Sequence, residues 1–206
     1  MNNLVKVVLV GCAVLGLAAC GVRVRGESDA PPKVPVSTGS TASTGSGTTA
    51  PAVPVNERGF VVRQLGEMGC FGGTGNDCVG GVSFAIDQVE VDPPCMEFGS
   101  HPDDGHTLLL HVRVTTGDDT EAIDEIRGII NPLLFVEIGK DGVTRRASFG
   151  MCADPMVNRL PDTYGPNQQY AGVLDVAAPE ASGTIALQLA FPDDNGQRGW
   201  EWTYPV

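Results

Sequence analysis

Eight residues near the middle of the chain read Leu108-Leu109-Leu110-His111-Val112-Arg113-Val114-Thr115. Every second residue from Leu108 to Val114 is a large aliphatic one, and polar residues occupy most of the positions between. Side chains of a β-strand point alternately to its two faces. The stretch therefore predicts a strand with one face in a hydrophobic core.

The same two-residue period recurs along residues 57–206 and predicts a series of short strands. It slips by one at Asp87-Gln88, as a β-bulge would require. The turn Gly139-Lys140-Asp141-Gly142 should join two strands as a hairpin. Phe191 should share the inner face of its strand with Leu187. The expected strands are residues 60–65, 82–91, 108–115, 133–138, 143–149, 170–176, 184–191 and 200–204, the last alternating aromatic with polar residues.

Residues 119–130 do not follow the two-residue period of a strand. Ile123, Ile126 and Ile130 recur at helical spacing there, after acidic residues at the start of the segment. One short helix is expected there. About seven short strands at these intervals indicate an all-β fold, a β-sandwich, over residues 57–206.

The N-terminus carries an export signal. After Lys6 the chain is apolar and uncharged from Val7 to Ala19. As a helix these residues would extend about 20 Å, less than the roughly 30 Å hydrocarbon core of a bilayer. Residues 1–19 are therefore expected to be a cleaved signal peptide and not a permanent membrane span.

The signal ends in Leu17-Ala18-Ala19-Cys20, which closely resembles the lipobox of bacterial lipoproteins. This resemblance implies cleavage before Cys20 and lipidation of its thiol, and two or more acyl chains anchor a protein stably. A rival tetrapeptide, Leu9-Val10-Gly11-Cys12, also fits but leaves too short an apolar region before it. An ordinary signal peptide is the other alternative, and it would leave Cys20 an unpaired thiol.

Residues 20–56 are rich in Pro, Ser, Thr, Gly, Ala and Val and lack the large side chains of a core. They are expected to form a disordered tether that lifts the domain off the membrane. The chain carries a net charge of −12. This balance disfavours nucleic acid as a partner, because phosphate binding needs clustered Lys and Arg. The expected partners are a membrane, through the lipid, and an unknown envelope protein or glycan.

Four cysteines remain after Cys12 and Cys20 are set aside, and an even number in an exported chain indicates two disulfides. Three pairings are possible. The preferred one joins Cys70 with Cys78, closing a Gly-rich loop, and Cys95 with Cys152.

The domain as a whole is similar to the small immunoglobulin-like domains of lipoproteins and secreted antigens from actinobacteria and related bacteria. The likeness rests on the lipobox, the Ser/Thr/Gly-rich tether, the Lys140-Asp141-Gly142 hairpin and the segments Tyr170–Val176 and Thr184–Phe191. It implies an immunoglobulin-like sandwich without catalytic residues. The disulfide and buried Trp of antibody domains are not evident in the sequence.

One cluster could carry chemistry, the segment His101-Pro102-Asp103-Asp104-Gly105-His106. Imidazoles and carboxylates suit zinc or copper(II). His111 follows closely, and Met96, Met151 and Met156 would come near if Cys95 pairs with Cys152. The alternative is a plain loop, because Pro102-Asp103-Asp104-Gly105 is also a sequence typical of turns.

Two other motifs have simpler explanations. The Gly-rich segment 69–75 lacks the Lys-Ser/Thr of a phosphate loop, and Ser83 lies inside a strand without a nucleophile elbow. The expectation is a lipid-anchored cell-envelope protein that presents a non-enzymatic binding or structural domain, with no cofactor, metal or catalytic residue. The alternative is a metal-handling or catalytic envelope lipoprotein using His101, Asp103 and His106.

Overall fold

The structure is a computed structural model that describes residues 54–74, 77–193 and 196–205. The expected signal peptide, Cys20 and nearly all of the expected tether lie outside these residues. None of the helices within the described ranges is long and apolar enough to cross a membrane.

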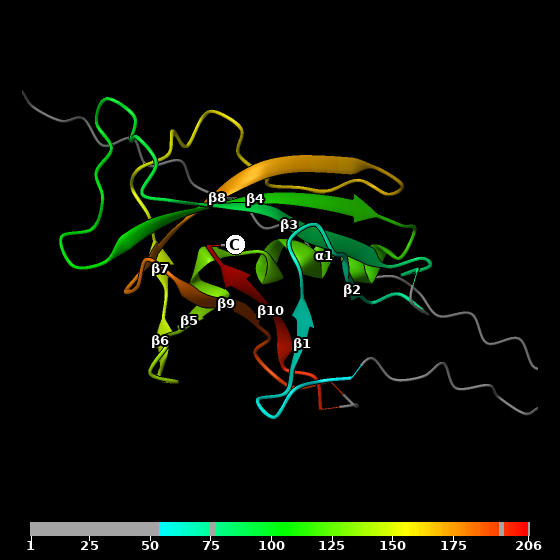
Figure 1. The fold of residues 1–206 in the computed structure, drawn as a ribbon. Coiled ribbons are helices and arrows are strands. Elements are labelled where there is room, and N and C mark those ends of the chain that lie inside the picture. The colour runs from blue at the N-terminus through cyan, green and yellow to red at the C-terminus, as the bar shows by residue number, and fades with distance from the viewer. Residues whose placement is uncertain (1–53, 75–76, 194–195, 206) are drawn as a thin grey trace, which may run out of the picture. The chain divides into compact units, whose positions relative to one another are not determined.

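Two five-stranded sheets face each other as the layers of a β-sandwich (Figure 1). The first sheet has the order β1 (Phe60–Arg63), β10 (Gly199–Tyr204), β9 (Gly183–Gln188), β5 (Phe135–Ile138) and β6 (Thr144–Arg146). The second has the order β2 (Gly69–Phe71), β3 (Val82–Val91), β4 (His106–Thr116), β8 (Gln169–Ala178) and β7 (Ser148–Phe149). Neighbouring strands are antiparallel except β1 and β10, which are parallel.

The strand order is that of an immunoglobulin-like sandwich. In chain order β3, β4, β7 and β8 take the places of strands A, B, D and E, and β5, β6, β9 and β10 take those of C, C′, F and G. Strands β1 and β2 are added at the edges of the two sheets. The sandwich is confirmed, with ten strands among the described residues where about seven were expected.

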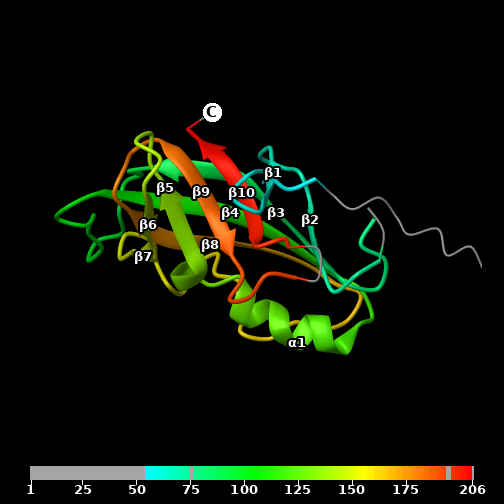
Figure 2. The same ribbon diagram turned by 90° about the horizontal axis from the view of Figure 1, so that it is seen from below.

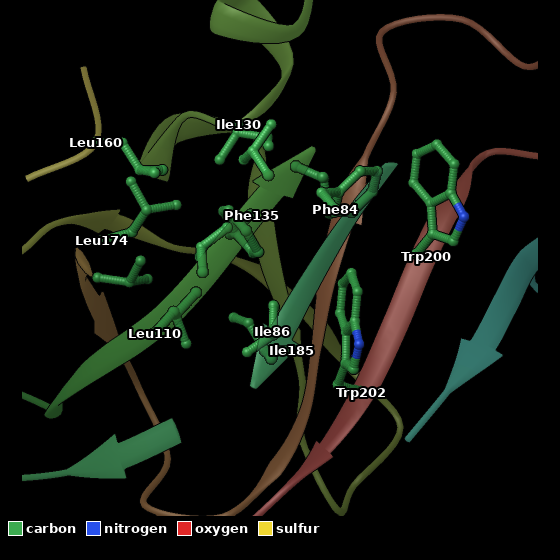
Figure 3. Close-up of a cluster of buried hydrophobic side chains, with 14 of the residues drawn as sticks. Phe84, Ile86, Leu110, Ile130, Phe135, Leu160, Leu174, Ile185, Trp200 and Trp202 are labelled. Carbon is green, nitrogen blue, oxygen red and sulfur yellow. The ribbon is translucent and has the colours of Figure 1, made fainter. Parts of the chain in front are cut away.

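The core lies between the inner faces of the two sheets, and the alternating residues Leu108, Leu110, Val112 and Val114 of β4 are buried in it, as predicted. The predicted bulge is present, because the register of β3 against β4 shifts between Ile86 and Gln88. Phe84 meets Trp200 edge to face, with ring centroids 4.8 Å apart (Figure 3). Edge-to-face aromatic pairs add about 0.5–1.5 kcal/mol beyond the area they bury.

The predicted helix is confirmed as α1 (Thr120–Ile129), which lies at one end of the sandwich (Figure 2). Asp119 caps it, since its side chain accepts the backbone N–H groups of Glu121 and Ala122. Ile123 and Ile126 pack into the main core. A short 3₁₀ turn, η1 (Pro132–Leu134), leads from the helix into β5.

Three local predictions are wrong. The segment 143–149 is not one hairpin arm, because the chain crosses at buried Ala147 from β6 in one sheet to β7 in the other. Phe191 is 82% exposed, because β9 ends at Gln188 and Pro192 cannot donate to a sheet. In β10 the polar residue Glu201 is buried like its aromatic neighbours.

Asn56 was assigned to the tether, but the structure attaches it to the sandwich. Its side-chain Nδ2 donates to Oε1 of Glu201 at 2.8 Å, and its side-chain Oδ1 accepts the backbone N–H groups of Arg58 and Phe60. Contacts with the sandwich therefore begin before residue 57.

Candidate functional site

The candidate site lies at the loop that joins β3 to β4, residues 92–105, which contains His101 of the predicted cluster, while His106 is the first residue of β4. Asp92 follows directly after β3 in the left-handed backbone region, with φ +49°. Its backbone N–H donates to the Thr107 carbonyl, and its Oδ1 accepts the Thr107 N–H at 3.0 Å. These two hydrogen bonds close the base of the loop.

Both histidines of the cluster approach the carboxylate of Asp92, His101 from the loop and His106 from the start of β4. Nδ1 of His106 lies 2.7 Å from Oδ2, and Nδ1 of His101 lies 3.8 Å from Oδ1. Nδ1 of His101 also lies 2.9 Å from the hydroxyl of Thr107. The hydrogen bond from His106, aided by the Thr107 N–H and the nearby imidazoles, lowers the pKa of Asp92 although burial opposes this. Asp92 is therefore a carboxylate at neutral pH.

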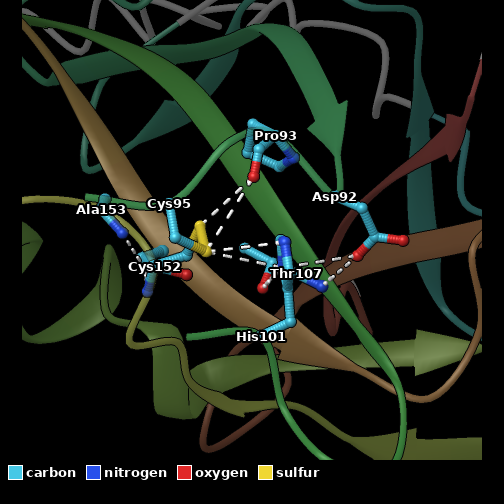
Figure 4. The surroundings of a disulfide bond; sticks show 8 residues. Asp92, Pro93, Cys95, His101, Thr107, Cys152 and Ala153 are labelled. Carbon is cyan, nitrogen blue, oxygen red and sulfur yellow. Dashed lines mark hydrogen bonds and ion pairs between the residues drawn. A yellow bond between two sulfur atoms is a disulfide. The ribbon is translucent and has the colours of Figure 1, made fainter. Parts of the chain in front are cut away.

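A disulfide fastens the same loop to the segment after β7. Cys95 pairs with Cys152, and Cys70 pairs with Cys78, which is the arrangement preferred from the sequence. The Cys95 sulfur lies 3.7 and 3.6 Å from the two ring nitrogens of His101 (Figure 4). A disulfide sulfur carries no proton and is no thiolate, so this contact is packing and neither cysteine is a metal ligand while the bond is intact.

The structure leaves other predicted candidates outside this group. Asp103 is exposed and makes no hydrogen bond or ion pair with the part of the chain that is described. His111 points elsewhere, because its Nε2 pairs with Glu90 of β3. Met96 and Met151 flank the disulfide through backbone hydrogen bonds, and Met156 is largely exposed.

Sequence reasoning missed Asp92, because its place beside the histidines depends on strand register. Val91 pairs with Leu108 across β3 and β4, so the next residue along β3 lies opposite Thr107. A carboxylate directly after one strand, with a histidine opening the next, was the signal that could have revealed it.

Ser83 and the Gly-rich loop take the structural roles expected of them. Ser83 lies within β3, and its hydroxyl is 3.5 Å from the carbonyl oxygen of Thr115 in β4. Cys70 and Cys78 close the loop between β2 and β3.

A separate hollow of about 440 Å³ lies between the α1–η1 end of the molecule and residues 149–164. Phe149, Val157, Leu160 and Tyr164 supply apolar surface. Two arginines and three carboxylates also line the hollow, namely Arg127, Arg159, Asp154, Asp162 and Asp175, and Arg159 pairs with Asp162. Burial raises the pKa of Tyr164 to about 12, so its hydroxyl stays protonated at neutral pH.

Asp175, on β8, holds one wall of this hollow in place. Its Oδ2 accepts the backbone N–H groups of Cys152 and Ala153, both at 2.7 Å. A Cβ on Gly150 would lie 1.6 Å from its Oδ1, so only glycine fits there. The hollow and the disulfide therefore share one anchoring carboxylate.

No protein-family profile matches the chain. A search of curated proteins also finds no match. Among solved structures, the chain is similar to the crystal structure of MPT63, a secreted protein from Mycobacterium tuberculosis. The identity is 12%, the alignment covers 59% of this chain and 82% of that one, and the TM-score is 0.38. A likeness at this level carries no argument about function.

Proposed function

We propose that this chain is a lipid-anchored cell-envelope lipoprotein that presents a non-enzymatic binding domain outside the cytoplasmic membrane. The observation that carries the proposal is the pair of disulfides in the sandwich, one closing the short loop after β2 and one fastening the β3–β4 loop to the segment after β7. Disulfides persist in oxidising compartments and are rare in the cytosol. The lipobox Leu17-Ala18-Ala19-Cys20 supplies the anchor in this proposal.

The hollow beside residues 149–164 is the binding surface in this proposal. Phe149 and Val157 line it and are 57% and 56% exposed. Exposed apolar side chains gathered beside a concave, mixed-polarity surface are typical of interaction sites. The partner is an envelope protein or glycan.

Cell fractionation tests the anchor, with a matched control in the same signal segment. Cys20→Ala should remove the protein from the membrane fraction or leave it as an uncleaved precursor. Cys12→Ala alters the rival lipobox and should leave the mature protein in the membrane. A mature, membrane-bound product from Cys20→Ala would refute the lipid anchor.

Photo-crosslinking in the same cells tests the binding surface. A photoreactive residue at Val157 should give a discrete adduct with an envelope component. The same residue at Val62, equally exposed on β1, should give none. Identical adduct patterns from the two positions would contradict a binding role for the hollow.

A further inference from the structure

We propose that Cys95, Cys152 and His101 form a redox-gated zinc site, in which reduction of the disulfide frees two sulfurs to bind the ion together with the imidazole. The donor atoms of these three residues all lie within 4.8 Å of one another. The proposed function needs only the oxidised protein, so this second state of the domain goes beyond it.

The distance between sulfur and imidazole already fits a zinc ion. With Zn–S bonds of about 2.3 Å and Zn–N bonds of about 2.0–2.1 Å, sulfur and nitrogen ligands of a tetrahedral ion lie about 3.5 Å apart. Nε2 of His101 lies 3.6 Å from the Cys95 sulfur (Figure 4). Two sulfur ligands of the same ion lie about 3.8 Å apart, which the side chains of Cys95 and Cys152 can reach by rotation once the bond is broken.

A buried hydroxyl group orients the imidazole as metal-binding histidines require. Nδ1 of His101 lies 2.9 Å from Oγ1 of Thr107, and Thr107 is 0% exposed. A histidine ligand usually donates the N–H of its other ring nitrogen to a neighbouring oxygen, which fixes its tautomer. With Nδ1 donating to Thr107, Nε2 keeps its lone pair for an ion beside the Cys95 sulfur.

Hydrogen bonds keep the two cysteines close together without the disulfide. The Met96 N–H donates to the Cys152 carbonyl, and the Ser100 N–H donates to the Met151 carbonyl, both at 3.0 Å. Asp175 accepts the Cys152 N–H at 2.7 Å. Reduction therefore removes the covalent link and leaves the β3–β4 loop beside the segment after β7.

The histidine side of the site is open to solvent. The His101 side chain is 42% exposed and Cys95 is half-buried, whereas Cys152 is buried. An ion can therefore enter beside His101 without unfolding of the sandwich. Two thiolates and an imidazole with water in the fourth position are a donor set that zinc uses in proteins.

The two states interconvert by thiol–disulfide exchange with a dithiol. The dithiol is oxidised to its own disulfide, the Cys95–Cys152 bond breaks, and each sulfur gains one proton. Zinc then binds both sulfurs as thiolates and releases these two protons. Under the proposed function, an exported chain that has not yet been oxidised is already in this reduced state.

Calorimetric titration of the full chain with ZnCl₂ tests the site. Cys12 and Cys20 are replaced by Ala throughout so that their thiols do not compete, and a phosphine reduces the protein. One zinc ion should bind per reduced chain and none per oxidised chain. His101→Gln should weaken binding about tenfold or more, whereas the matched control His106→Gln should bind within about twofold of the parent chain.

A second measurement needs no variant of the site and separates it from the other cysteine pair. In the reduced parent chain, zinc should protect Cys95 and Cys152 from alkylation by iodoacetamide and leave Cys70 and Cys78 reactive, as peptide mass mapping would show. Three results would each overturn the proposal: no zinc binding after reduction, binding unchanged in His101→Gln, or protection of Cys70 and Cys78 equal to that of Cys95 and Cys152.

Discussion

Glu137 is a buried carboxyl group whose replacement should stabilise the domain. It lies on the inner face of β5, its residue is 0% exposed, and neither carboxyl oxygen has a hydrogen-bond partner among the described residues. Burial raises the pKa of Glu137, nearby Glu180 raises it further, and Arg145 opposes the shift. The Glu137 carboxyl group therefore stays protonated to a higher pH in the folded domain than in the unfolded chain.

The sign of the pH dependence follows from proton binding. A raised pKa means that the folded state binds more protons than the unfolded state above the ordinary Glu pKa of about 4.3. Stability is therefore lost as pH rises through the folded-state pKa of Glu137. The destabilising effect of Glu137 should be smallest near pH 4 and largest at neutral pH.

The size of the effect follows from burial without a partner. An unsatisfied buried polar group costs about 1–3 kcal/mol. Methionine fills a similar volume, adapts its shape to the cavity and has no group that requires a hydrogen bond. Glu137→Met should therefore raise the free energy of unfolding by about 1–3 kcal/mol at pH 7, or Tm by about 2–4 °C for each kcal/mol in a domain of this size.

The matched control is Glu201→Met on β10. Glu201 is also buried, at 5% exposure, but its two oxygens accept from Arg58 at 2.7 and 2.8 Å, and Oε1 also accepts from Asn56. Its loss should lower stability by about 1–3 kcal/mol, because charge-assisted hydrogen bonds are lost. Thermal melts followed by circular dichroism from pH 4 to pH 8 measure both variants. A Tm for Glu137→Met at or below that of the unmodified protein at pH 7, or a gap independent of pH, would refute the reasoning.

Two further predictions concern the segment after β7. Gly150→Ala should lower Tm by several degrees, because its Cβ would displace the Asp175 carboxylate, whereas Gly128→Ala in α1 has open space and should stabilise by up to about 1 kcal/mol. Equal melts for the two would contradict the close approach at Gly150. Replacing Cys95 and Cys152 together by Ser should cost about 4 kcal/mol, since the bond spans 57 residues. An unchanged urea midpoint would contradict a stabilising role for this bond.

Local patterns in the sequence were enough to predict much of the fold. The alternation of apolar and polar residues in 108–115 located β4. A one-residue slip of the alternation in residues 82–91, at Asp87-Gln88, located the bulge in β3, and the isoleucine spacing after Asp119 located α1. These features follow from side-chain direction within one element, which repeats every 2 or 3.6 residues. The export signal and lipobox are likewise local, and the sequence alone carries that proposal.

Contacts between distant segments decided the rest. Whether a polar residue points inward depends on which strand covers it, so the alternation in β10 could not reveal that Glu201 is buried beneath Asn56, 145 residues away. The split of the segment 143–149 between two sheets has the same origin.

The candidate site likewise combines residues that the local sequence revealed with one that only the tertiary structure revealed. The sequence supplied His101 and His106, and their spacing suggested Asp103 as the carboxylate. Only the pairing of β3 with β4 brought Asp92 beside both rings, because register between strands is set by the buried faces of the whole sheet and not by the loop that joins them.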